Sequence, residues 1–118
     1  MSSIVPHYSS ARAAGDWVFV SGQLPFGPDR TVIAGGIREQ TAQCLANIAA
    51  ILAGKGLGLE HVVKTTVWLS RTADFTEFNA AYAAVFVGRP PARSTVRADL
   101  MVDARVEIEA VAFRGAKA

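Results

Sequence analysis

The strongest constraint on the fold lies in residues 106–113, which alternate between two kinds of side chain. Successive side chains of a β-strand point to opposite faces of its sheet, so an alternation of period two predicts an extended strand. One face would carry Val106, Ile108, Ala110 and Ala112, and the other Glu107, Glu109, Val111 and Phe113. The first of these faces suits a hydrophobic core. The second mixes carboxylates with apolar groups and is unusual for either core or solvent.

Another strand is predicted shortly before it, in residues 90–96. Two prolines stand at its entrance, and small and β-branched residues follow. If the two strands form a hairpin centred near Met101, Arg93 lies opposite Glu109. A guanidinium facing a carboxylate on a half-apolar surface would suit a small anionic substrate. The alternative is an interface salt bridge from Arg93 to Glu109 or Glu107, with no ligand.

The remaining elements are read from hydrophobic periodicity. Apolar residues recur every three or four positions over 37–52 and again from 75 to 86, which predicts two amphipathic helices. Asp74 and Glu77 have the spacing of a capping box at the start of the second helix. Strands are predicted near 8–13, 17–21 and 62–69. The resulting order predicts an α+β fold, with one mixed sheet and both helices on one face.

The face of this sheet without helices would be bare. In the strand over 62–69, Val63, Thr65, Val67 and Leu69 suit the helix side, and Lys64, Thr66 and Trp68 point away. An aromatic side chain buries ~150–250 Å² at ~25 cal/mol per Å², so leaving several rings in water would forgo many kcal/mol. We therefore expect a homo-oligomer whose interface also carries Lys64, Arg93 and the two glutamates.

Composition narrows the class of protein. The 118 residues predict one domain, 1–118, with residues 115–118 flexible. The net charge is only +2 and the arginines are scattered, which argues against nucleic acid as the main partner. No run approaches the ~18 apolar residues of a membrane span, and no secretion signal is recognisable at the N-terminus. The single cysteine, Cys44, suits a cytoplasmic location. His7 and His61 lack a second ligand at metal spacing, so no metal is expected.

Four polar or small residues are further candidates for a ligand site, each with a plainer interpretation. Tyr8 could cover a pocket or simply pack near the terminus. Gly22 ends a strand where the backbone can approach a ligand closely, or it only makes a turn. Asn79 could bind a substrate or face solvent. Glu109 could hold or deprotonate a water if burial raised its pKa, or pair with a nearby cation, and Glu107 competes for this role.

Several blocks in this order resemble the Rid imine deaminases, of the RidA/YjgF type and also called the L-PSP family. The match covers nearly the whole chain. The blocks that carry it are residues 17–25, 63–67, 78–82, 91–96 and 106–112. The resemblance implies a chorismate-mutase-like α+β sandwich assembled as a homotrimer, with active sites between subunits. It also implies hydrolysis of 2-imino or enamine acids, such as 2-iminobutyrate and 2-aminoacrylate, to 2-keto acids and ammonia, with no cofactor.

Site residues follow from the resemblance position by position. Arg93 matches the arginine that binds the substrate carboxylate, and Glu109 the glutamate that positions the attacking water. Tyr8, Gly22 and Asn79 match positions around the pocket. Thr95 stands at a substrate-binding position where members of the family often have a cysteine. Contacts that the main chain makes to the substrate there would survive this change, whereas a role for the thiol would not. Two alternatives remain open: an endoribonuclease-like activity, and a non-catalytic trimer that binds a small molecule.

Overall fold

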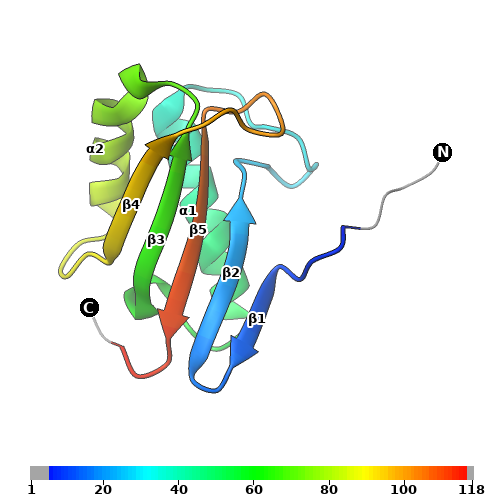
Figure 1. Cartoon of the computed structure of the whole chain (residues 1–118), viewed down its shortest axis with the longest axis vertical. Coiled ribbons are helices and arrows are strands. Elements are labelled where there is room, and N and C mark those ends of the chain that lie inside the picture. The colour runs from blue at the N-terminus through cyan, green and yellow to red at the C-terminus, as the bar shows by residue number, and fades with distance from the viewer. Residues whose placement is uncertain (1–5, 117–118) are drawn as a thin grey trace.

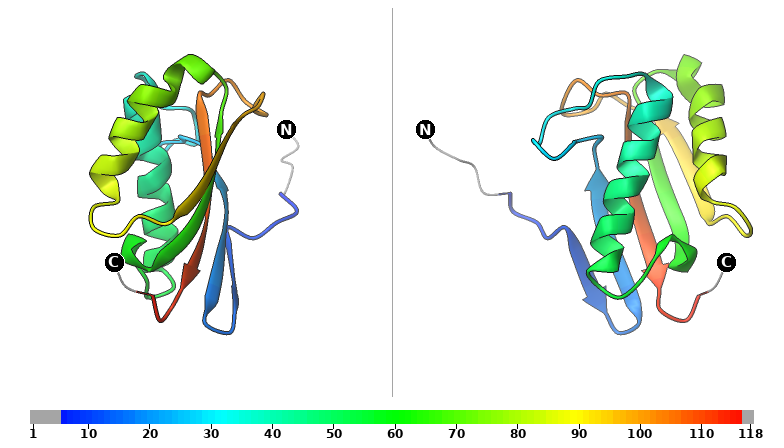
Figure 2. Two further views of the ribbon diagram at one scale, coloured as in Figure 1. Left: turned by 60° about the vertical axis from the view of Figure 1, so that its left-hand side comes forward. Right: turned by 180° about the vertical axis from the view of Figure 1, so that it is seen from behind.

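The computed structural model describes residues 6–116 as one mixed sheet covered on one face by two helices (Figures 1 and 2). This confirms the α+β architecture predicted from the sequence. Residues 1–5, which belong to the segment inspected for a secretion signal, lie outside the described residues, as do 117–118 of the stretch expected to be flexible. The elements are β1 (Ala11–Ala14), β2 (Trp17–Gln23), α1 (Ile37–Ala53), η1 (Leu59–His61), β3 (Val62–Leu69), η2 (Thr72–Asp74), α2 (Phe75–Val85), β4 (Ala92–Arg97) and β5 (Val106–Phe113).

The strand order is β1-β2-β5-β3-β4, and it contradicts the predicted hairpin of the last two strands. β5 lies between β2 and β3 and pairs antiparallel with both. β4 pairs parallel with β3 on the side away from β5. A parallel neighbour needs a crossover, and α2 supplies it between β3 and β4. Arg93 therefore pairs with Thr65, and Glu109 pairs with Thr66. Because adjacent residues of β3 point to opposite faces, Arg93 and Glu109 lie on opposite faces of the sheet.

The hydrophobic core lies between the sheet and the helices. The alternation of β5 is confirmed, because its four even-numbered residues are buried and its odd-numbered residues are half-buried. In β3 the prediction fails at Val63, since a register shift between Val62 and Lys64 turns Val62 into the core instead. The stripe of α1 is confirmed, with one unexpected buried polar member, Gln40. The fully buried α1 side chains are Thr41, Cys44, Leu45, Ile48 and Leu52.

The start of α2 differs from the capping-box prediction. Asp74 has helical backbone angles and makes no side-chain cap hydrogen bond. Its carboxylate instead accepts two hydrogen bonds from Arg105, and Glu77 pairs with Arg38 of α1. Both acids therefore connect α2 to other elements, which spacing alone could not show.

The opposite face of the sheet is open, as the sequence predicted (Figure 2). Trp17 is 44% exposed and Phe19 is 49% exposed. The Trp17 and Phe113 rings lie 4.6 Å apart between centroids, across the β2–β5 pair. Neither α1 nor α2, the two α-helices of the described chain, is long and apolar enough to cross a bilayer.

Candidate functional site

Arg93 is held against one face of α2. Its guanidinium carbon lies 4.8 Å from the ring centroid of Tyr82, 5.3 Å from that of Phe78 and 5.7 Å from that of Phe75. Its Nη1 donates a hydrogen bond of 2.9 Å to Oδ1 of Asn79. These four partners follow helical spacing, so α2 presents them together to the edge strand β4. The cation is stabilised by the electron-rich faces of three rings.

The groups around Arg93 form a hollow of about 400 Å³, which we call the Arg93 hollow. A guanidinium carries five N–H donors, so the bond to Asn79 leaves enough for a bidentate contact with a carboxylate. Burial raises the pKa of Tyr82, and its hydroxyl shares a 2.7 Å hydrogen bond with Thr65. The ring therefore stays neutral beside the cation. The hollow is lined by Asn79, Tyr82, Ala83, Phe86, Pro90, Pro91 and Arg93.

Thr95 lies two residues after Arg93 on the same face of β4, but it does not line the Arg93 hollow. Its hydroxyl oxygen is buried, and it has no hydrogen-bond partner among residues 6–116. The residue borders a separate crevice of about 260 Å³ that Phe75 and Leu69 also line. Thr95 is thus next to the candidate site without offering its hydroxyl to a ligand there.

Glu107 and Gly22 meet on the open face of the sheet. A Cβ atom at position 22 would collide with the Glu107 carboxylate, so glycine is what leaves room for this side chain. Burial raises the pKa of Glu107, and the negative charge of Glu109 raises it further. The sequence analysis ranked Glu107 behind Glu109. The contact with Gly22 depends on the pairing of β2 with β5, which spacing alone does not reveal.

Glu109 and Tyr8 come together at a different place on the open face. They line a hollow of about 390 Å³ together with Phe19, Ser21 and Arg12. Tyr8 is 67% exposed, and the segment that carries it is tied down by a 2.6 Å hydrogen bond from Ser21 Oγ to the carbonyl of Ser9. The predicted site residues therefore form two groups on opposite faces, with Arg93 and Asn79 on one and Tyr8, Gly22 and Glu109 on the other.

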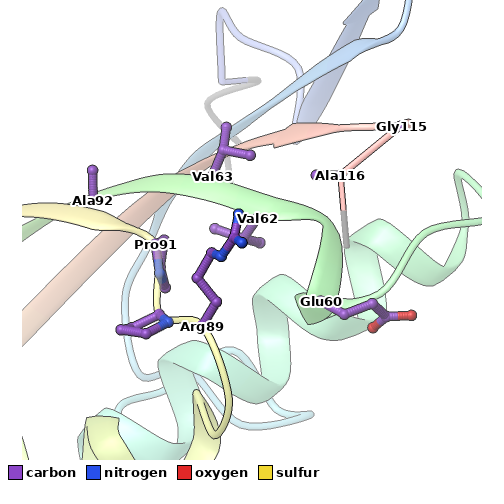
Figure 3. A pocket seen from close by; sticks show the side chains of 9 residues that line it. Glu60, Val62, Val63, Arg89, Pro91, Ala92, Gly115 and Ala116 are labelled. Carbon is purple, nitrogen blue, oxygen red and sulfur yellow. The ribbon is translucent and has the colours of Figure 1, made fainter. Parts of the chain in front are cut away.

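A larger hollow adjoins the Arg93 hollow, and Pro90 and Pro91 line both. It measures about 600 Å³ and lies where β3 and β4 begin, lined by Arg89, Glu60 and the end of the described chain (Figure 3). None of the predicted site residues lines it. Size alone therefore does not identify the site.

The described part of the chain contains neither a cluster of metal-ligating side chains nor an exposed cysteine. Over residues 6–116, no three His, Cys, Asp or Glu side chains are grouped so that they could hold a metal ion. Cys44 is buried in the core, and burial raises the pKa of its thiol. The interpretation of Cys44 as a core residue is confirmed.

Comparison with known proteins agrees with the fold and with the sequence blocks. The model of the family described as Endoribonuclease L-PSP matches residues 2–114. A rat 2-iminobutanoate/2-iminopropanoate deaminase is 38% identical over 92% of this chain and 80% of its own length. The yeast (Saccharomyces cerevisiae) protein Mmf1, named as mitochondrial, is 40% identical over 89% of this chain and 73% of its own. The crystal structure of the Escherichia coli YjgF gene product superposes with a TM-score of 0.88 at 36% identity, covering 95% of this chain and 91% of that one.

The fold is thus that of the YjgF-type proteins, a mixed sheet with one face covered by helices. The chain belongs to the Endoribonuclease L-PSP family, which also includes the YjgF and RutC proteins. The resemblance stated from the sequence is confirmed. Its relatives include a rat protein named as an imine deaminase and a Thermotoga maritima protein described as a putative endoribonuclease.

Proposed function

We propose that this protein hydrolyses reactive 2-imino acids and their enamine forms to 2-keto acids and ammonia. The observation that carries the proposal is the Arg93 guanidinium, held by three rings and Asn79 at the edge of a hollow. Such a cation suits the carboxylate of 2-iminobutyrate or 2-aminoacrylate. The activity named for the rat relative supports the same reaction class.

We further propose that the working form is a homotrimer with its active sites between subunits. Arg93 and the two glutamates lie on opposite faces of one sheet, so they can meet only if a second copy brings its open face to the edge strand β4. The exposed rings of Trp17 and Phe19 on that face favour burial against such a copy. Each site would then take Arg93 from one copy and a carboxylate from the next.

In the proposed mechanism, Arg93 binds the substrate carboxylate through two parallel hydrogen bonds, and Asn79 keeps the guanidinium oriented. A carboxylate of the neighbouring copy holds a water against the carbon of the C=N bond. The water oxygen forms a bond to that carbon while the second C=N electron pair moves to the nitrogen, which takes up one water proton. The remaining water proton then passes to the nitrogen, the C–N bond breaks, and ammonia leaves as the C=O bond of the keto acid forms. Imines hydrolyse unaided, so positioning and acid–base assistance of ~100- to 10,000-fold are sufficient.

The sequence resemblance assigned the water to Glu109, but the contacts favour Glu107. Glu107 is accommodated by the missing side chain of Gly22, and its raised pKa suits a group that exchanges protons. Glu109 lies beside Tyr8 and Arg12 in a separate hollow. We therefore propose Glu107 for the water and keep Glu109 as the competing candidate. Tyr8 shares its hollow with Glu109 and would close the pocket if Glu109 holds the water.

The test is the release of 2-oxobutyrate from freshly generated 2-iminobutyrate, measured above the uncatalysed rate. Arg93→Ala should lower kcat/KM at least ~100-fold, because both charge-assisted hydrogen bonds to the substrate are lost. Arg89→Ala is the matched control, since Arg89 lines the larger hollow but not the Arg93 hollow, and its loss should leave the rate unchanged. An undiminished rate in Arg93→Ala would overturn the proposal.

The family description raises ribonuclease activity as a second candidate. It would be supported by digestion of RNA that follows the protein through purification and persists in Arg93→Ala. A third outcome, tight binding of 2-keto acids without turnover of any imine, would indicate a binding protein with no catalytic role.

We also propose a cytoplasmic location. The chain has one cysteine, Cys44, and it is buried in the core, which suits a reducing compartment. Because the relative Mmf1 is named as mitochondrial, the check is fractionation of the source cells with an antibody against the protein. Recovery in the particulate or organelle fraction would contradict a cytoplasmic location.

A further inference from the structure

Arg105, directly before β5, is bound to three other elements at once. Its Nε and Nη2 donate hydrogen bonds of 2.9 and 2.6 Å to the two carboxylate oxygens of Asp74, at the start of α2. Its backbone N–H donates to Oε1 of Gln40 on α1 at 2.8 Å. Its carbonyl accepts a 3.1 Å hydrogen bond from the backbone of Ser70, just after β3. One residue thus ties both helices and the central strands together.

The pair with Asp74 is enclosed on its carboxylate side. Asp74 is 6% exposed, and Gln40 is equally buried. The bidentate contact of the Arg105 fork lowers the pKa of the Asp74 carboxyl, so the pair stays charged. Asp74 stands where a helix cap was predicted, yet it makes no cap hydrogen bond and bonds to Arg105 instead. The bond to Arg105 therefore takes the place of an interaction that would have stabilised α2 locally.

The pair also joins the two elements that carry the candidate site residues, because α2 holds Arg93 and β5 carries Glu107. Asp74 immediately precedes Phe75, the first residue of the helix whose face holds Arg93. Arg105 directly precedes β5 and stands two residues before Glu107. A shift of the helix start would move the rings and Asn79 against Arg93, and a shift of Arg105 would move the carboxylate.

We propose that Asp74 and Arg105 are positioning residues for imine hydrolysis, fixing α2 and the start of β5 so that Arg93 and Glu107 are each held in their productive orientation. This inference rests on the proposed function. Neither residue touches the substrate. Both act through the residues that do.

The test compares two conservative variants with a matched control. Arg105→Lys keeps the charge but loses the planar fork, and Asp74→Glu keeps the carboxylate but moves it by one methylene. Either should lower kcat for 2-iminobutyrate about 10- to 100-fold at a temperature well below unfolding, because small misplacements of catalytic groups are costly. Arg38→Lys alters an exposed ion pair that joins α1 to Glu77 of α2, and kcat should stay within about twofold of the wild type.

The measurements are kcat, KM and the thermal unfolding midpoint for each variant. A lowered midpoint with unchanged kcat in a folded Arg105→Lys or Asp74→Glu protein would show a structural role alone and overturn the inference. If Arg105→Lys does not fold, Asp74→Glu decides, since it preserves both charges and also the guanidinium fork of Arg105. Failure of the proposed function would appear separately, as a wild-type protein without imine hydrolysis or an Arg93→Ala variant with full activity.

Discussion

The two candidate groups differ in how completely one chain builds them. The surroundings of Arg93 are complete within a single copy, because three rings and Asn79 of the same chain orient its guanidinium. Glu107 and Glu109 lie instead on a face that has no helix over it. Burial raises the pKa of Glu107, and the negative charge of Glu109 raises it further. The comparison teaches that substrate recognition can be built into one fold, whereas the hydrolytic half depends on what covers the open face.

Replacement of Arg93 by lysine should give the largest effect. Lysine keeps the charge but lacks the fork, so it cannot make two parallel bonds to a carboxylate or stack on the rings. We expect kcat/KM for 2-iminobutyrate to fall about 100-fold, close to the effect of Arg93→Ala. Arg89→Lys serves as the control, and a lysine variant with near wild-type kcat/KM would show that the fork is not used.

The two glutamates are separated by matched amide variants. Glu107→Gln should lower kcat about 100-fold, because the group that holds the water loses its charge, whereas Glu109→Gln should change kcat only a few-fold. Equal losses, or a larger loss in Glu109→Gln, would return the role to Glu109.

The pH dependence of activity also distinguishes Glu107 from Glu109. The pKa of Glu107 lies above its ordinary 4.5, so activity should fall as the pH drops through this raised value and the carboxylate takes up a proton. Glu109→Gln removes the neighbouring negative charge and should move this acid limb to lower pH. A limb that stays in place would show that Glu107 is not the titrating group.

Gly22→Ala should have an intermediate effect. The added methyl group would collide with the Glu107 carboxylate and push it from its place. We expect kcat to fall about 10-fold with little change in KM, because Arg93 on the other face is untouched. Ala13→Gly on the edge strand β1 is a control for a single-methyl change in the sheet. An unchanged kcat in Gly22→Ala would mean that the position of Glu107 is unimportant.

Thr95→Cys should have the smallest effect on activity. The Thr95 hydroxyl is buried without a partner and does not line the Arg93 hollow, so the rate should stay within about threefold. The less polar thiol should raise the free energy of unfolding by about 1 kcal/mol, measured by urea denaturation. A tenfold gain in rate would show that the thiol takes part in the reaction.

The sequence was sufficient for the layers of the fold but not for the neighbours in the sheet. The alternation of β5 and the stripe of α1 depend on local periodicity, and both were correct. The hairpin of β4 and β5 was wrong because pairing depends on the crossover through α2, which periodicity does not encode. That error placed Arg93 and Glu109 on one face.

The candidate site was predictable only where chemistry follows residue type. An arginine in a predicted strand indicated a group that binds an anion, and in the structure Asn79 accepts a hydrogen bond from this arginine. The contact between Gly22 and Glu107 joins β2 to β5, and the bond between Asp74 and Arg105 spans 31 positions of the chain. Such contacts come from tertiary packing, and no local pattern in one sequence reports them.

The central claim is that each active site takes its arginine and its carboxylate from different copies. The direct test mixes Arg93→Ala with Glu107→Gln, each nearly inactive alone, and purifies the mixed assemblies through two affinity tags. If the arginine and the carboxylate of each site come from adjacent copies, every mixed trimer holds one intact site out of three, so the purified mixed assemblies should show roughly a third of the wild-type activity. Mixed assemblies that remain as inactive as their parents would contradict the account.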